Sequence, residues 1–210
     1  MKKLFALLLT LCTLLALAGC GQKDTNNSSK PPAESSAAVQ QNSESNKLAA
    51  GKNLVVYFSA TGNTETVARQ IANLTQGDLF KIEPAAPHTE QDLDYNNQNS
   101  RVYLEHADPA KQAVALKTNT PQGWAEYSTV YVGYPIWWGS AAWPVTSFVK
   151  ANNFTGKTVI PFCTSASSGL GSSAAELSKA ATGGTWQAGK RFGSSPDEST
   201  VQEFVTNNKG

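Results

Sequence analysis

The chain contains the run Leu54-Val-Val-Tyr-Phe-Ser-Ala-Thr-Gly-Asn-Thr64. Its first part is apolar, β-branched and aromatic, which is typical of a strand buried on both faces of a parallel sheet. The second part is small, polar or glycine, and apolar residues then recur at helical spacing at Val67, Ile71 and Leu74. The run therefore predicts a strand, a turn and a helix, the unit from which α/β proteins are built.

Strand and helix patterns continue to alternate along the chain. Further strands are predicted at residues 79–82, 127–134, 157–163 and, more weakly, 185–192. Helices are predicted at residues 141–151, at 170–181 and around Val201 and Phe204. A long polar stretch, residues 83–124, is expected to hold a helix within residues 92–107 that ends at Asp108-Pro109. The alternation predicts a doubly wound α/β sheet, in which ligands bind at the carboxyl ends of the strands.

The N-terminal quarter of the chain has a different composition. Lys2 and Lys3 precede an uncharged apolar run at residues 4–18, which is short for a membrane span and fits a secretory signal peptide. The run ends in Leu17-Ala-Gly-Cys20, which resembles a bacterial lipobox. We therefore expect a signal peptide at residues 1–19 and a lipid on Cys20, with an ordinary signal peptide or an uncleaved anchor as alternatives. Residues 20–52 are rich in Ser, Asn and Gln and predict a disordered tether, which leaves residues 53–210 as the folded domain.

Composition and cysteine positions narrow the class of protein. The 210 residues carry 17 Lys and Arg against 16 Asp and Glu, and this net charge of +1 argues against a broad basic surface for nucleic acid. Three cysteines are too few for a disulfide framework. Since Cys12 lies in the signal peptide and Cys20 carries lipid, only Cys163 would be a free thiol, and we expect it to be buried and inert. Export with a lipid predicts a location on the outer face of the bacterial cytoplasmic membrane, or on the periplasmic side of an outer membrane.

The loop after the first strand is a candidate phosphate site. Its residues, Ser59-Ala-Thr-Gly-Asn-Thr64, precede a helix N-terminus, where free N–H groups and the helix dipole attract an anion. A Walker loop is excluded because the Gly-Lys-Ser/Thr motif is missing. Helix capping by Thr61 or Asn63 is the alternative interpretation.

Two further loops follow the third and fourth predicted strands. In Gly133-Tyr-Pro-Ile-Trp-Trp-Gly139, the rings can stack on a flat heteroaromatic ligand, or the Trp residues can pack under the insertion at residues 84–124. The second loop, residues 164–173, offers hydroxyl groups and close backbone approach. It contains Gly169-Leu-Gly-Ser-Ser-Ala174, a GxGxxG/A match that favours a Rossmann dinucleotide site only weakly, because no acidic residue ends the next strand.

Taken together, the three loops resemble the flavodoxin family, and in particular its flavodoxin-like bacterial lipoproteins. The residues that carry the likeness are Tyr57-Phe-Ser-Ala-Thr-Gly-Asn-Thr64, Gly133-Tyr-Pro-Ile-Trp-Trp-Gly139, and Pro161-Phe-Cys-Thr-Ser165 with Gly169 and Gly171. The resemblance covers residues 53–210 and implies a five-stranded parallel sheet in the order 2-1-3-4-5 with non-covalent FMN.

The resemblance also assigns roles to residues of this sequence. It implies that the FMN phosphate is held by Ser59, Ala60, Thr61, Gly62, Asn63 and Thr64. It implies that the isoalloxazine, with a Trp on one face, is flanked by Pro135, Ile136, Trp137, Trp138 and Gly139. The pyrimidine edge of the ring would lie along Thr164, Ser165 and Gly169.

The function implied by this resemblance is electron transfer by a membrane-tethered FMN protein, either a carrier or a small flavin-dependent reductase. Its partners would be redox donor and acceptor proteins or small quinone-type molecules. No general acid or nucleophile is evident in the loops, which favours the carrier. Because the phosphate loop holds no cation and the aromatic site would be dry, we expect the anionic reduced flavin to be disfavoured. The alternative is a non-redox ligand-binding lipoprotein that retains the fold.

The long insertion carries the remaining candidates. Asp94, Tyr95, Arg101 and Glu105 would form either a lid or a solvated helix, and Arg before Glu at this spacing is the poorer order for an ion pair, which favours the solvated helix. The two histidines, His88 and His106, are expected to be solvated and not to hold a metal.

Overall fold

The structure is a computed structural model that describes residues 51–208. The expected signal peptide, the lipidation at Cys20 and nearly all of the expected tether lie outside these residues. Within the described range, no helix has the length and apolarity needed to cross a membrane.

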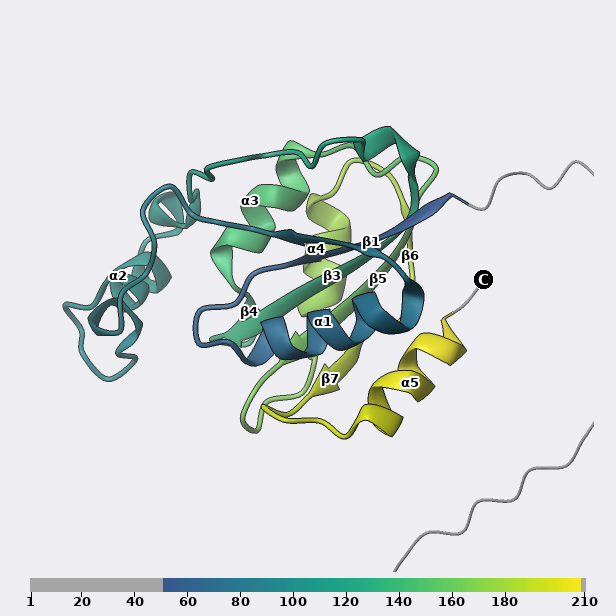
Figure 1. Cartoon of the computed structure of the whole chain (residues 1–210). Helices are drawn as coiled ribbons and strands as arrows, with labels where there is room; N and C mark the ends of the chain where they lie inside the picture. The colour runs from purple at the N-terminus through teal and green to yellow at the C-terminus, as the bar shows by residue number, and fades with distance from the viewer. Residues whose placement is uncertain (1–50, 209–210) are drawn as a thin grey trace, which may run out of the picture. The chain divides into compact units, whose positions relative to one another are not determined.

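A mainly parallel sheet forms the centre of the domain (Figure 1). Its strands are β1 (Lys52–Tyr57), β2 (Asp78–Lys81), β3 (Tyr127–Trp137), β5 (Thr158–Thr164), β6 (Thr185–Trp186) and β7 (Lys190–Phe192). The order is β2-β1-β3-β5-β6, and β7 also pairs in parallel with β5. Counting β6 and β7 as two pieces of a fifth strand gives the order 2-1-3-4-5 that the resemblance implied. The short β4 (Ser140–Ala141) is an unexpected antiparallel addition that pairs with the end of β3.

Helices cover both faces of the sheet, as a doubly wound fold requires (Figure 1). They are α1 (Asn63–Thr75) and α5 (Glu198–Asn207) on one face, and α3 (Trp143–Ala151) and α4 (Ser173–Ala180) on the other. The alternation of side chains along β1 serves both layers: Val55 and Tyr57 pack with α1 and α5, and Leu54 and Val56 pack in the opposite core. This two-sided burial explains why the strand is almost continuously apolar.

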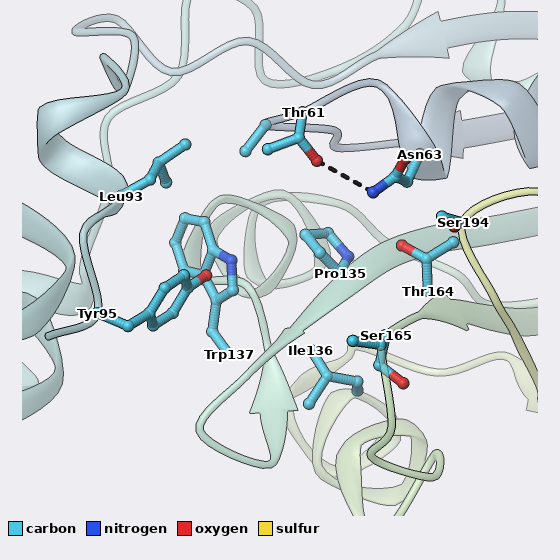
Figure 2. Close-up of a pocket in the computed structure, with 12 residues that line it drawn as sticks. Thr61, Asn63, Leu93, Tyr95, Pro135, Ile136, Trp137, Thr164, Ser165 and Ser194 are labelled. Carbon is cyan, nitrogen blue, oxygen red and sulfur yellow. Dashed lines mark hydrogen bonds between the residues drawn. The ribbon is translucent and has the colours of Figure 1, made fainter.

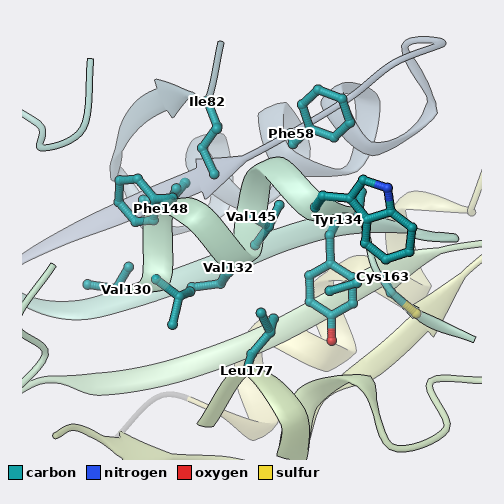
Figure 3. Packing of buried hydrophobic residues seen from close by; sticks show 14 of the residues in the cluster. Phe58, Ile82, Val130, Val132, Tyr134, Val145, Phe148, Cys163 and Leu177 are labelled. Carbon is teal, nitrogen blue, oxygen red and sulfur yellow. The ribbon is translucent and has the colours of Figure 1, made fainter. Parts of the chain in front are cut away.

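The core on the side of α3 and α4 supports the carboxyl ends of the strands (Figure 3). Val132 and Tyr134 of β3 pack there with Phe148, and the Tyr134 hydroxyl lies 3.1 Å from Ser173 Oγ. Cys163 is part of the same cluster and is a free, fully buried thiol, as expected. Burial raises the pKa of this thiol to about 12, so it is unreactive at neutral pH.

The insertion between β2 and β3 is mostly irregular. It contains α2 (Arg101–Ala107) and the short 3₁₀ turns η1 (Gln91–Leu93), η2 (Pro109–Gln112) and η3 (Trp124–Glu126). The expected helix is therefore shorter than residues 92–107, although it does end at Asp108-Pro109. The reason is local: Asp94 Oδ1 accepts from the N–H of Asn96, and Asn97 Oδ1 from that of Asn99, so these side chains hold turns in place of a helix.

Candidate functional site

A cavity of about 380 Å³ opens at the carboxyl ends of β1, β3 and β5 (Figure 2). Its volume lies within the usual range for a small-molecule site. The described residues that line it are all uncharged: Ala60, Thr61, Asn63, Leu93, Tyr95, Pro135, Ile136, Trp137, Thr164, Ser165, Ala166 and Ser194. The three loops that the sequence singled out therefore meet at one site.

The phosphate loop reaches this cavity with its helix end open. Gly62 is the N-cap of α1 at φ 91°, and no side chain of the described chain caps the helix. The alternative of capping by Thr61 or Asn63 is therefore not observed, and Asn63 Nδ2 instead donates to Thr61 Oγ1 at 3.3 Å. The N–H groups of the first turn have no partner within the helix, so they form a donor set that suits an anion.

Other members of this loop have structural roles. Ser59 Oγ accepts from the N–H of Gly62 at 3.0 Å and closes the turn. Thr64 is buried, and its Oγ1 lies 2.8 Å from Thr164 Oγ1, so it links α1 to the end of β5. Neither Ser59, Gly62 nor Thr64 is among the residues that line the cavity. The side chains of Ser59 and Thr64 therefore fix the shape of the loop, which leaves the backbone N–H groups of the first turn for the anion.

Glu65, the acidic residue in the first turn of α1, is neutralised away from the cavity. Its carboxylate accepts from Arg69 Nη2 at 2.6 Å and from Lys81 Nζ at 3.1 Å. Hydrogen bonds from Arg69 and Lys81 hold the pKa of Glu65 below its usual value. The negative charge of Glu65 is therefore balanced by Arg69 and Lys81, which reduces its repulsion of an anion at the helix end.

The aromatic loop after β3 separates its two tryptophans. Trp137 ends β3, lines the cavity and is only 2% exposed, with Phe58, His88 and Trp143 packed edge-on around its ring. Trp138 does not line the cavity. It begins the turn to β4 at φ 46°, beside Gly139 at φ 84°. Its ring stacks on that of His106, with ring centroids 4.4 Å apart and an interplanar angle of 5°. Both tryptophans contact the insertion, which was the alternative interpretation of this motif.

The insertion contributes directly to the cavity. Leu93 and Tyr95 line it (Figure 2), and the Tyr95 ring also contacts Trp138, with ring centroids 4.8 Å apart. Tyr95 is 43% exposed, and its partial burial raises the pKa of the hydroxyl to about 12, so this side chain is neutral at the cavity wall. Tyr95 therefore acts as part of the wall, which favours the lid over the solvated helix.

Buried polar contacts fix the insertion to the domain. Glu105 Oε1 accepts from Arg101 Nε at 2.6 Å, and Glu105 Oε2 lies 3.3 Å from His88 Nε2. The side chains of His88 and Glu105 are only 1% and 7% exposed. The prediction of a solvated helix and a solvated His88 was wrong, because the His88 ring packs against Trp137 and Phe58 while its nitrogen bonds the carboxylate. His106 is exposed, as expected, but its ring is stacked on Trp138. No cluster of potential metal ligands occurs among residues 51–208.

The end of β5 brings Thr164 to the cavity, and the loop that follows brings Ser165 and Ala166. Gly169 is exposed and does not line it. A Cβ on Gly171, at φ 55°, would lie 3.8 Å from the carbonyl oxygen of Gly139. Of the glycines in the GxGxxG/A match, Gly171 therefore lies at the contact between this loop and the β3–β4 turn.

Two residues of the site, Leu93 and Ser194, were missed in the sequence, and Ala166 lies within the predicted loop at residues 164–173 but had been given no role. Ser194 follows β7, so its position after a parallel strand is a signal that could have found it. Leu93 lies in a polar insertion and gave no signal.

Comparisons with known proteins agree with this geometry. A family model described as flavodoxin matches residues 52–208. A crystal structure of a protein assigned as a flavoprotein from Bacteroides eggerthii is 38% identical, covers 75% of this chain and 97% of that one, and superposes with a TM-score of 0.68. Its counterpart from Bacteroides uniformis is also 38% identical, with 74% and 98% covered and a TM-score of 0.69.

A more distant structure is the Lactobacillus acidophilus flavoprotein in complex with FMN. It is 20% identical, with 74% of this chain and 99% of that one covered and a TM-score of 0.55, and it supports the fold alone. No curated protein matches the chain. The family match and the 38% identical structures show that the chain belongs to the flavodoxin family.

Proposed function

We propose that the protein binds FMN in the cavity at the strand ends and uses it for electron transfer. The observation that carries the proposal is the pairing of an uncharged, partly aromatic cavity with an uncapped N-terminus of α1. A flat, largely uncharged ring system suits the cavity wall, and a monophosphate suits free N–H groups without a lysine. The FMN complex of the Lactobacillus acidophilus flavoprotein is consistent with this assignment.

The chain's own residues would bind and orient the cofactor. Thr61, Asn63 and the first-turn N–H groups would hold the phosphate, and Pro135, Ile136 and Trp137 would flank the ring. Thr164 and Ser165 would lie along its pyrimidine edge, and Tyr95 would exclude water from the side of the insertion. FMN itself supplies the redox chemistry when bound.

The decisive test is cofactor content. The full-length protein, extracted from membranes in mild detergent, is expected to be yellow and to release FMN on denaturation, and the apoprotein should quench the fluorescence of added FMN. A colourless protein that neither binds nor quenches FMN would favour the non-redox ligand-binding alternative.

We also propose that the protein is lipid-anchored at Cys20 outside the cytoplasm, which places its redox partners there. The partners would be proteins or small quinone-type molecules. Cells given a labelled fatty acid should incorporate the label into the wild type and into Cys12→Ser, the matched change in the leader, but not into Cys20→Ser. Equal labelling of the two variants, or an unlabelled wild type, would argue against the lipid.

A further inference from the structure

Arg191 of β7 reaches across to the loop that follows β5. Its Nη2 donates to the carbonyl oxygen of Ser165 at 2.6 Å and to that of Ala166 at 2.7 Å, and its Nε donates to Ser165 Oγ at 3.1 Å. Ser165 and Ala166 both line the cavity. One guanidinium therefore holds the loop on which the pyrimidine edge of the flavin would rest.

The charge of Arg191 has no partner of opposite sign in the described part of the chain. Within residues 51–208, no carboxylate lies within ion-pair distance of this guanidinium. Its neighbour Lys190 differs, because Lys190 Nζ lies 3.5 Å from Glu203 Oε2. All the described cavity-lining residues are uncharged, so no lining side chain compensates the positive charge at this end of the site.

We propose that Arg191 raises the reduction potential of the bound flavin by stabilising negative charge at its pyrimidine end. Uptake of two electrons and one proton leaves one negative charge on the N1–C2 carbonyl side of the ring, and uptake of a second proton removes it. A fixed, partly buried cation behind the Ser165–Ala166 loop favours the charged form, because the guanidinium attracts negative charge on the ring. The inference rests on the proposed function. It reverses the expectation, drawn from the phosphate loop without a cation, that the anionic reduced flavin is disfavoured.

The competing explanation is that Arg191 is only a clamp on the loop. The electrostatic role and the clamp predict different results when Arg191 is replaced by lysine. Lysine keeps the charge but lacks the planar fork that bonds two carbonyl oxygens at once. An electrostatic role predicts that Arg191→Lys keeps the wild-type potential. A clamp predicts that Arg191→Lys lowers the potential as much as a neutral substitution does.

The experiment is a dithionite titration of the FMN-bound, full-length protein, in which dithionite supplies the electrons and the two-electron midpoint potential is measured. The variants are R191Q and R191K, with R191M as a second neutral side chain. The matched control is Lys190→Gln, which removes one positive charge from the adjacent position of the same strand. The dissociation constant of oxidised FMN is measured for each variant.

We expect R191Q to weaken binding of reduced FMN about tenfold more than binding of oxidised FMN, which corresponds to a fall of about 30 mV in the two-electron potential. R191K should stay near the wild-type potential, and K190Q should match the wild type. An unchanged potential in flavin-bound R191Q, an equal fall in K190Q, or an equal fall in R191K would overturn the proposal. Failure of both neutral variants to fold would also overturn it in favour of the clamp. If the wild type binds no FMN, it is the proposed function that fails.

Discussion

Gly62 adopts a left-handed backbone at φ 91°, with nothing within 4 Å of the position where a Cβ would stand. A side chain there meets no neighbour, so the penalty for Gly62→Ala is conformational. We expect a loss of about 1–2 kcal/mol in the free energy of unfolding, measured by urea denaturation. FMN affinity should also fall, because the turn at Gly62 presents the N–H groups of α1 and alanine would strain this turn.

Gly156→Ala is the matched control for this change. Gly156 is also left-handed, at φ 78°, with open space around it, but it lies ahead of β5 at the far end of the strand. A similar loss of stability with unchanged FMN affinity is expected. If both variants lost affinity equally, the phosphate loop would have no special part in binding.

Gly133 is required for a different reason, which is space. A Cβ at this position would lie 2.2 Å from Phe162 Cζ in the neighbouring strand. Gly133→Ala should therefore destabilise the protein by about 1–3 kcal/mol through overpacking, measured by urea denaturation. In the double variant with Phe162→Leu, the loss should be smaller than the sum of the two single losses, and strict additivity would contradict the steric explanation.

Individual residues of the site could be predicted where the chemistry is local. Thr61, Asn63, Pro135, Ile136, Trp137, Thr164 and Ser165 all line the cavity as the motifs indicated. Arg191 could not be found this way, because its acceptors lie 25 and 26 positions earlier in the chain. His88 was misjudged for the same reason: a polar neighbourhood in sequence does not reveal that its ring packs on Trp137.

The insertion contains a buried carboxylate, Glu105, that is paired with His88 and Arg101. Burial by itself raises the pKa of Glu105, but hydrogen bonds from His88 and Arg101 outweigh burial and hold it below 4.5. A lowered pKa in the folded state stabilises the protein above the unfolded value, and this stabilisation is lost as the pH falls through the folded pKa. Glu105→Gln should lower the free energy of unfolding by about 1–3 kcal/mol at neutral pH.

This difference should shrink as the pH falls through the lowered pKa of Glu105, because the wild-type carboxyl is then protonated in the folded state as well. Urea denaturation at several pH values measures it. The control is Glu90→Gln at an exposed position of the same insertion. It should leave the free energy of unfolding unchanged at every pH. A pH-independent difference would show that packing, and not ionisation, gives Glu105 its effect.

Elements with a strong apolar pattern were predicted well, and those shaped by contacts were not. The strands at β1, β3 and β5 follow directly from their buried runs. The fifth strand is divided into β6 and β7, and between them Gly189 passes close to β5, where a Cβ would lie 2.8 Å from the carbonyl oxygen of Pro161. The extension of β3 to Trp137 depends on pairing with β4, which a local pattern does not reveal.

For the whole molecule, cofactor binding and folding should be coupled. A ligand that binds only the folded state at one hundred times its dissociation constant adds about 2.7 kcal/mol, or roughly 5–10 °C in melting temperature for a domain of this size. We expect FMN to produce this shift in a thermal melt. Riboflavin, which lacks the phosphate, should give a smaller shift at the same concentration, and an equal shift would remove the argument for the phosphate loop.

Topology was the most predictable property at this scale, since alternating strands and helices allow few arrangements. The course of the insertion was not predictable, because its position depends on Tyr95, Trp138 and His106 meeting from distant parts of the sequence.

The uncharged lining of the cavity has one more consequence. Attraction between formal charges weakens with ionic strength, whereas binding through N–H dipoles and ring contacts is much less affected. Uptake of the cofactor should therefore change little between dilute and salty media. At the location that we propose, beyond the cytoplasmic membrane, the protein would meet both kinds of medium.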